Sequence, residues 1–230
     1  MNFLNKLEKK YRKYAIPNLM YYIVMLYGAG LVIQLFAPMA YWRFLSLDIG
    51  ALMHGQIWRL VTFIIYPPTM GTFVFDSVFF GIISLFLYYS LGVTLERVWG
   101  AFRFNVFFLM GMVGEILAAL VSYFVFHQNL YVTTGFLNFS LFLAFAICFP
   151  DVQFYLFMVI PVKAKWMAIA ESAVYVYSFL VGSASTRCEI VLSLANVILF
   201  FLMTRNYSRI NPKEIHRKQQ FKQQTKIRMP

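Results

Sequence analysis

The sequence predicts an all-α membrane protein with six spanning helices and a long loop at the membrane surface after the first helix. Of its 230 residues, 61% are hydrophobic and only 13% are charged, whereas soluble domains are about half apolar and a quarter charged. Aromatic residues make up 20% of the chain, which is more apolar surface than a soluble fold of this size can bury. Apolar runs long enough to cross a bilayer also recur along the chain.

The clearest span is the second one, within Asp76–Gly100. Its nineteen residues from Ser77 to Leu95 carry no charge and rise about 28 Å as a helix, close to the hydrocarbon thickness of a bilayer. The run ends with Gly92, Glu96 and Gly100, which lie on one helix face because they are four residues apart. This spacing predicts close helix packing around a carboxylate.

The first span is expected at Asn18–Ala37, between two prolines. Residues 1–17 precede it as a basic amphipathic tail, which suits a helix lying on lipid headgroups, with a frayed tail as the alternative. Residues 39–72 are too polar and irregular to span. Because Trp42 and Trp58 are interface aromatics, this loop is expected at the membrane surface or partly within it.

Four further spans complete the set of six within a membrane domain of residues 18–204. They are expected at Phe104–Phe126, Thr133–Phe149, Lys163–Gly182 and Cys188–Thr204. Residues 152–161 form an apolar connector between the fourth and fifth spans. The basic, Gln-rich residues 205–230 are expected to be a poorly ordered tail.

The positions of the basic residues predict the orientation. With six spans, 17 of the 20 Lys and Arg residues fall on the side that holds both termini; the exceptions are Arg43, Arg59 and Arg187. The positive-inside rule then places both termini in the cytoplasm. The net charge of +11 is expected to face anionic lipid rather than nucleic acid, because the basic residues lie in tails and turns.

Three segments resemble rhomboid proteins. Residues 55–62, GQIWRLVT, are similar to the first-loop segment of that family, which carries a Trp-Arg pair, here Trp58 and Arg59. Residues 91–100 resemble the end of the rhomboid second helix, and residues 149–166 resemble the connection between its fourth and fifth helices. The resemblance covers about residues 18–204. Derlins and other inactive relatives share this scaffold.

The resemblance implies a place for a Ser–His dyad, with the serine in a turn at the start of helix four and the histidine on helix six. The expected serine position falls near Gly135. Ser140 lies more than a helical turn deeper, between Phe139 and Leu141. A nucleophile needs small neighbours, a base and oxyanion donors, so this serine does not fit the role.

The base is missing as well. The chain has three histidines, His54, His127 and His216, and none lies in helix six. The expected position falls in residues 193–196, where Asn196 is an amide that cannot accept a proton near neutral pH. The oxyanion-binding residues of the family would fall near Phe80 and Ser84. The sequence therefore indicates a rhomboid-like pseudoprotease with no catalytic residues, metal ligands or cofactor.

Two carboxylates fall deep inside predicted spans, Glu115 and Glu171, about 12–18 Å from the start of each helix. An ionised carboxylate there is unfavourable by a few kcal/mol or more unless it is paired or neutral. The functional interpretation is a shared proton or ion site. The structural interpretation, which we favour, is a neutral or hydrogen-bonded pair facing the bundle interior, because no chain of charged residues leads to either membrane face.

The other polar residues have structural explanations. Glu96 is expected to accept hydrogen bonds from loop backbone, Arg97 or Arg103. Trp58 and Arg59 are expected to tie the first loop to the bundle or the headgroups. Between helices four and six, interhelical hydrogen bonds are expected from Asn138, Ser140, Ser193 and Asn196.

The function that the resemblance implies is binding, without cleavage, of transmembrane segments of client proteins, as in quality control or trafficking. Lipids and such client segments are the expected partners. The expected location is a bacterial plasma membrane, with the endoplasmic reticulum as the alternative. Two other functions stay open: an intramembrane serine protease with displaced residues, and a proton- or ion-coupled transporter that uses Glu115 and Glu171.

Overall fold

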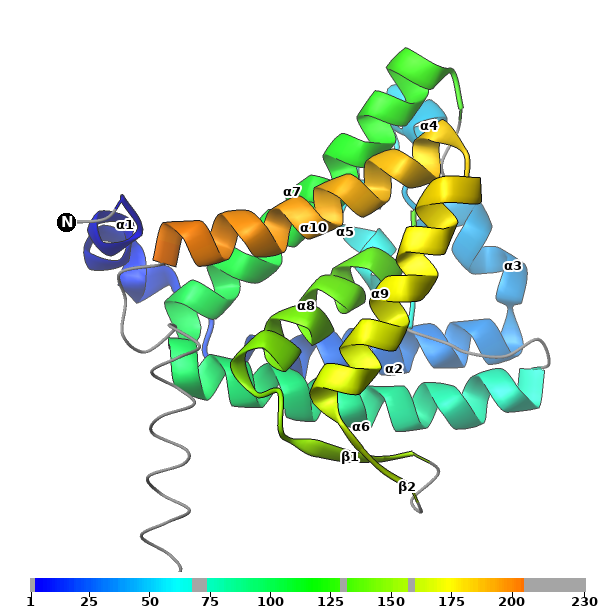
Figure 1. The fold of residues 1–230 in the computed structure, drawn as a ribbon. Helices are drawn as coiled ribbons and strands as arrows, with labels where there is room; N and C mark the ends of the chain where they lie inside the picture. Colours follow the sequence, from blue (N-terminus) through cyan, green and yellow to red (C-terminus); the bar gives the residue numbers. More distant parts are fainter. Residues whose placement is uncertain (1–2, 68–73, 129–131, 157–159, 205–230) are drawn as a thin grey trace, which may run out of the picture.

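The computed structural model describes residues 3–67, 74–128, 132–156 and 160–204 (Figure 1). The chain is mostly helical, as predicted for an all-α membrane protein. Four helices are long and apolar enough to cross a membrane: α2 (Leu19–Phe36), Phe79–Trp99 within α6 (Val74–Trp99), α7 (Ala101–Phe126) and α10 (Ala184–Thr204). The tail predicted at residues 205–230 lies outside the described residues.

The other two predicted spans are α8 (Gly135–Cys148) and α9 (Ala164–Val181), and neither is among these four. The 14 residues of α8 rise only about 21 Å, less than the thickness of the hydrocarbon layer. The 18 residues of α9 include Lys165 and Glu171, which lower its hydropathy. The predicted count of six spans is therefore not confirmed, because only four helices in the described part of the chain are long and apolar enough to cross a membrane.

Helix α8 lies at the centre of the bundle, in contact with α6, α7, α9 and α10. Ten of its 14 residues are buried, and they lie all round the helix rather than on one face. Figure 1 shows α8 between α10 and α6, with α9 crossing beside it. Because other helices enclose it, α8 does not need to match the thickness of the surrounding lipid.

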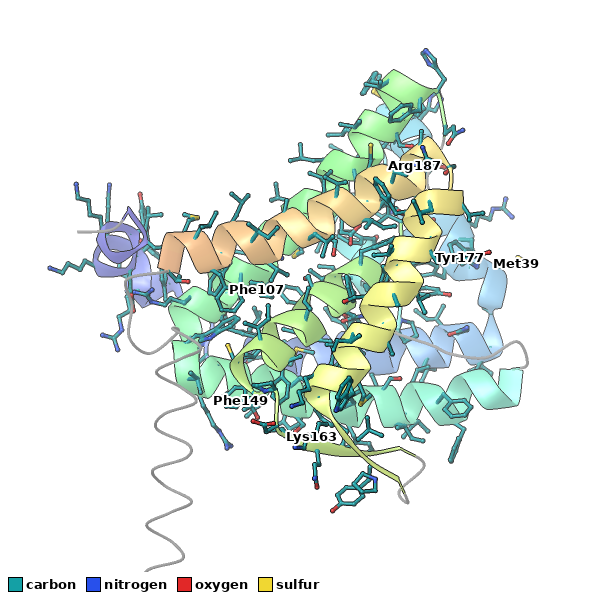
Figure 2. The ribbon with its side chains drawn as sticks, in the orientation of Figure 1. Met39, Phe107, Phe149, Lys163, Tyr177 and Arg187 are labelled. Atoms are coloured by element: carbon teal, nitrogen blue, oxygen red, sulfur yellow. The ribbon has the colours of Figure 1, made fainter. Side chains whose placement is uncertain are left out.

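Helices α7 and α10 form the most extensive helix pair, and they run antiparallel. At one end the hydroxyl of Ser122 donates to that of Ser185 at 2.5 Å. At the other end the rings of Phe107 and Phe200 pack with centroids 5.1 Å apart (Figure 2 labels Phe107). Between these ends Gly111 makes room for the side chain of Asn196.

Helix α2 packs against α6 through glycines. A Cβ atom on Gly92 would lie 2.3 Å from the Met20 side chain, and one on Gly81 would lie 2.5 Å from the side chain of Leu31. On α2 itself, a Cβ on Gly30 would lie 1.9 Å from the backbone oxygen of Ile65. Small residues thus allow these segments to approach to backbone distance, as is usual for helices in lipid.

The loop after α2 was predicted to be irregular, but it consists of short helical segments. They are α3 (Pro38–Ala40), η2 (Tyr41–Leu45), α4 (Ile49–Met53), α5 (Arg59–Thr62) and η3 (Phe63–Ile65). Helices of three to five residues are too short to show the repeat of apolar residues from which longer helices are predicted. The Tyr41 hydroxyl lies 3.2 Å from the Phe63 carbonyl oxygen, to which it donates. Burial raises the pKa of Tyr41, which keeps this donor neutral.

The connector between α8 and α9 is a hairpin of β1 (Gln153–Leu156) and β2 (Ile160–Lys163), which are antiparallel. Its aromatic and β-branched residues favour strands, although the sequence predicted only an apolar connector. The Phe154 ring packs on those of Phe142 and Phe145 in α8. In Figure 2, Phe149 and Lys163 lie at this end of the bundle, where α8 ends and α9 begins.

The N-terminal segment is helical in α1 (Phe3–Tyr11) and η1 (Arg12–Tyr14), and α1 docks on α7 and α10. Leu4 is fully buried there. Glu8 Oε2 accepts hydrogen bonds from Arg103 at 2.6 and 3.0 Å, and Arg103 itself is only 1% exposed. The basic residues on the opposite side of α1 are exposed, so the helix is amphipathic.

Replacing Gly30 with alanine should destabilise the protein by about 1–3 kcal/mol or more, because the new methyl group would overlap the backbone oxygen of Ile65, which cannot rotate away. Gly28→Ala is the matched control, since a Cβ on Gly28 meets no atom within 4 Å. Thermal unfolding of the two variants in detergent measures the difference. Equal stability of the two variants would contradict the close approach of α2 to this loop.

Candidate functional site

The place that a rhomboid dyad would occupy is the N-terminal half of α8, where α2, α7 and α10 meet it. The region is rich in polar side chains that are at most 8% exposed. These are Glu115 on α7, Thr134 just before α8, Asn138 and Ser140 on α8, and Glu189, Ser193 and Asn196 on α10. A polar cluster of this kind inside an apolar bundle is the strongest candidate for a functional site.

Ser140 is held in hydrogen bonds on both sides. Its hydroxyl donates to the Leu137 carbonyl oxygen at 2.8 Å and accepts from Asn196 Nδ2 at 3.4 Å. Its neighbours Phe139 and Leu141 are both 1% exposed. The predicted hydrogen bond between the fourth and sixth helices is therefore present, and the Ser140 oxygen has neither a base nor open space beside it.

The positions expected for the family's histidines hold other residues. On α10, Ser193 donates to the Phe136 carbonyl oxygen at 2.9 Å. Phe80 and Ser84 on α6 are half-buried. Among the described residues, His54 and His127 both have exposed side chains, while His216 lies outside the described part of the chain. The α8–α10 contact is thus made by hydroxyl and amide groups.

A second hydrogen-bond chain joins α2 to α8 and to the first loop. The Tyr27 hydroxyl donates to Asn138 Oδ1 at 3.0 Å, and Asn138 Nδ2 donates to Thr134 Oγ1 at 3.1 Å. Thr134 Oγ1 in turn donates to the carbonyl oxygen of Tyr66 at 2.8 Å. Sequence reasoning found Asn138 but missed Tyr27 and Thr134, because hydropathy does not reveal which face of an apolar helix is buried.

Glu115 binds the N-terminus of α8. The Glu115 carboxylate faces the backbone N–H of Leu137, in the first turn of α8. The residue before the helix, Thr134, makes no side-chain cap of its own. A carboxylate is favourable here because first-turn N–H groups lack partners within the helix and the N-terminus carries a partial positive charge. Glu115 therefore supplies from α7 the cap that α8 lacks.

Glu96 has the same role at the start of α2. Its Oε1 accepts a hydrogen bond of 2.6 Å from the Asn18 N–H, and the carboxylate also lies near the N–H of Leu19. The expected bond to loop backbone is found, whereas Arg103, also considered as its partner, instead pairs with Glu8. Gly92, one turn earlier, lets α2 approach, and Gly100 adopts a positive φ of 86° where α6 turns into α7.

The acidic neighbour of Glu115 is Glu189 on α10, rather than the expected Glu171. Glu171 is half-buried on α9 and interacts electrostatically with Tyr88 and Tyr175. The packing of the helices explains this difference. Helix α7 pairs with α10, which carries Glu189, whereas α9, which carries Glu171, contacts α8, α10 and β2. Glu189 was missed because the sixth span was expected to begin at residue 188, which places Glu189 at the end of the helix. Helix α10 instead begins at Ala184, so Glu189 lies inside it.

Trp58 and Arg59 form their hydrogen bonds within the first loop rather than with the bundle. Arg59 is 3% exposed and donates to the carbonyl oxygens of Ser46, at 2.7 Å, and Arg43. It also donates to Gln56 Oε1 at 2.7 Å. The Trp58 indole donates to the Phe44 carbonyl oxygen at 3.1 Å, with half of its surface exposed. The pair fixes the shape of the loop.

Comparison with known proteins gives no relative: no family model, curated protein or solved structure matches the chain. The rhomboid resemblance therefore depends on the residues of this chain alone. The chemistry open to the site is limited by its own hydrogen bonds and burial, which leave Ser140 without a base.

Arg59→Met should lower the free energy of unfolding by about 2–3 kcal/mol, because it leaves buried loop carbonyls without their charged donor. Arg97→Met, at an exposed arginine near the end of α6, is the control and should change stability little. Denaturant titration of both variants in detergent micelles provides the measurement. An Arg59 variant as stable as the wild type would show that the loop does not need its guanidinium.

Proposed function

We propose that this chain is a rhomboid-like pseudoprotease that binds transmembrane segments of client proteins without cleaving them. The order of the three resembling segments, in residues 55–62, 91–100 and 149–166, supports this assignment. In this proposal α8 and α9 act as spans beside the four long helices, which makes six. The distribution of Lys and Arg supports cytoplasmic positions for both termini.

The observation that carries the proposal is the hydrogen bonding of Ser140. Its proton is committed to the Leu137 carbonyl oxygen, and the side chain facing it from α10 is the amide of Asn196. An amide cannot remove a proton from a hydroxyl near neutral pH. Since Phe139 and Leu141 fill the space on either side, a substrate carbonyl could not approach this oxygen.

The apolar surfaces of α6 and α9 are the faces proposed to receive a client helix. Helix α9 buries little of itself, with Ala164 and Ala168 as its buried residues, and it has little direct contact with α6. Both helices expose large apolar side chains, among them Phe79, Ile82 and Phe86 on α6 and Ile169, Val174 and Tyr177 on α9. A client helix placed between them would reach α8.

The two alternatives make different predictions. An intramembrane protease with displaced residues requires hydrolysis of a helical substrate that depends on Ser140. A proton- or ion-coupled transporter requires flux that is lost on Glu→Gln substitution at Glu115 or Glu171. The proximity of Glu115 to Glu189 gives the second alternative a different acidic pair from the one expected from the sequence.

A serine-reactive fluorophosphonate should not label the purified protein above the level of its Ser140→Ala variant, because the Ser140 hydroxyl has no base to activate it. In-gel fluorescence against an active serine hydrolase measures this. Labelling that is strong in the wild type and absent from Ser140→Ala would overturn the proposal in favour of a protease.

A photoreactive amino acid placed at Phe86 on α6 or Tyr177 on α9 should capture membrane-spanning segments of other proteins in intact membranes. The control position is Leu109 on α7, which is 54% exposed and also apolar. Mass spectrometry of the adducts should find spanning segments several times more often at the first two positions. Equal capture at all three positions would point to random lipid-phase collisions.

A further inference from the structure

Two buried oxygen atoms between α7 and α10 have no hydrogen-bond partner: Glu115 Oε2 and Asn196 Oδ1. Each of these residues is 4% exposed, and Glu189 beside them is 7% exposed. Each unpaired buried group is unfavourable by about 1–3 kcal/mol. A cation held between these two helices would supply the partner that both oxygens lack.

Glu115 and Asn196 both lie near the first turn of α8. Asn196 Nδ2 lies 3.0 Å from the position of a Cβ on Gly111, which is one α7 turn before Glu115. Leu137 lies close to both residues. Its side chain lies 2.4 Å from the Cβ position on Gly111, beside Asn196, and its backbone N–H faces the Glu115 carboxylate. Glu189 interacts electrostatically with Glu115 from α10.

The donors on Ser140, Ser193 and Asn196 are already used. The Ser140 and Ser193 hydroxyls donate to backbone carbonyl oxygens, and the Asn196 amide donates to Ser140. The salt bridges found within the described residues join Glu8 with Arg103 and Asp151 with two lysines, and none includes Glu115 or Glu189. What remains at the cluster is therefore a set of oxygen acceptors.

We propose that Glu115, Glu189 and Asn196 form a binding site for Na⁺ within the membrane domain. Carboxylate and amide oxygens are the ligands that hard cations prefer. Na⁺ suits the site better than Ca²⁺, because two carboxylates and one amide offer fewer oxygen ligands than Ca²⁺ usually takes. The positive N-terminus of α8 offsets part of the remaining negative charge.

A bound Na⁺ would join α7 to α10 at the level where both contact α8. It would neutralise one carboxylate charge in a region where an uncompensated ion is strongly unfavourable. The ion would therefore act as a structural link in the centre of the bundle. This role does not depend on client binding, so the two proposals are tested separately.

The test uses the full chain purified in a non-ionic detergent, with ²²Na⁺ binding and thermal unfolding as readouts. Na⁺ should bind saturably and raise Tm relative to N-methyl-D-glucamine at equal ionic strength and fixed pH. Glu115→Gln and Glu189→Gln should each weaken Na⁺ binding at least tenfold. Glu171→Gln is the matched control, because this residue lies on α9 outside the cluster, and it should bind Na⁺ as the wild type does.

Several results would overturn the site. Wild-type protein that binds no ²²Na⁺ would exclude it, even if the variants fail to fold. A Tm that follows pH but not Na⁺ would mean that the carboxyl groups carry protons in place of the ion. Equal loss of binding in Glu171→Gln and Glu115→Gln would place the ion elsewhere in the bundle.

Discussion

In a lipid-embedded bundle, a buried polar group must find its partner within the protein, because the surrounding hydrocarbon supplies none. This constraint acts most strongly on the N-terminal half of α8, which is enclosed by four other helices. Tyr27, Thr134 and Asn138 meet it by hydrogen bonding to one another. Each such bond contributes only about 0.6 kcal/mol on average. Their larger effect is on specificity, since a rotated or shifted α8 would leave these groups unpaired.

The backbone N–H groups at helix N-termini also need partners within the protein. At two helices of this chain, a carboxylate from a neighbouring helix takes that place. Glu96 on α6 caps α2, and Glu115 on α7 caps α8. In soluble proteins the cap usually comes from the residue just before the helix. Here a neighbouring helix supplies it, so each cap also fixes the position of one helix against another. Both carboxylates are thus explained by backbone geometry, apart from any chemistry they perform.

The long helices could be predicted from the sequence because length and hydropathy alone decide what lipid accepts, as residues 101–126 illustrate. The contacts within the bundle could not. Nothing in an apolar run distinguishes Tyr27, which is buried, from Tyr22, which is exposed. Glu189 was missed because its helix begins four residues earlier than expected, and the hairpin after α8 because strand and helix segments of four to eight apolar residues look alike.

The docking of α1 has a consequence for biosynthesis. Glu8 leaves the ribosome early, but its partner Arg103 is 95 residues further on, and α10, which α1 also contacts, is made later still. The N-terminal helix therefore cannot complete these contacts until α10 has been synthesised. Leu4 becomes buried only then, so an incomplete chain exposes this apolar side chain.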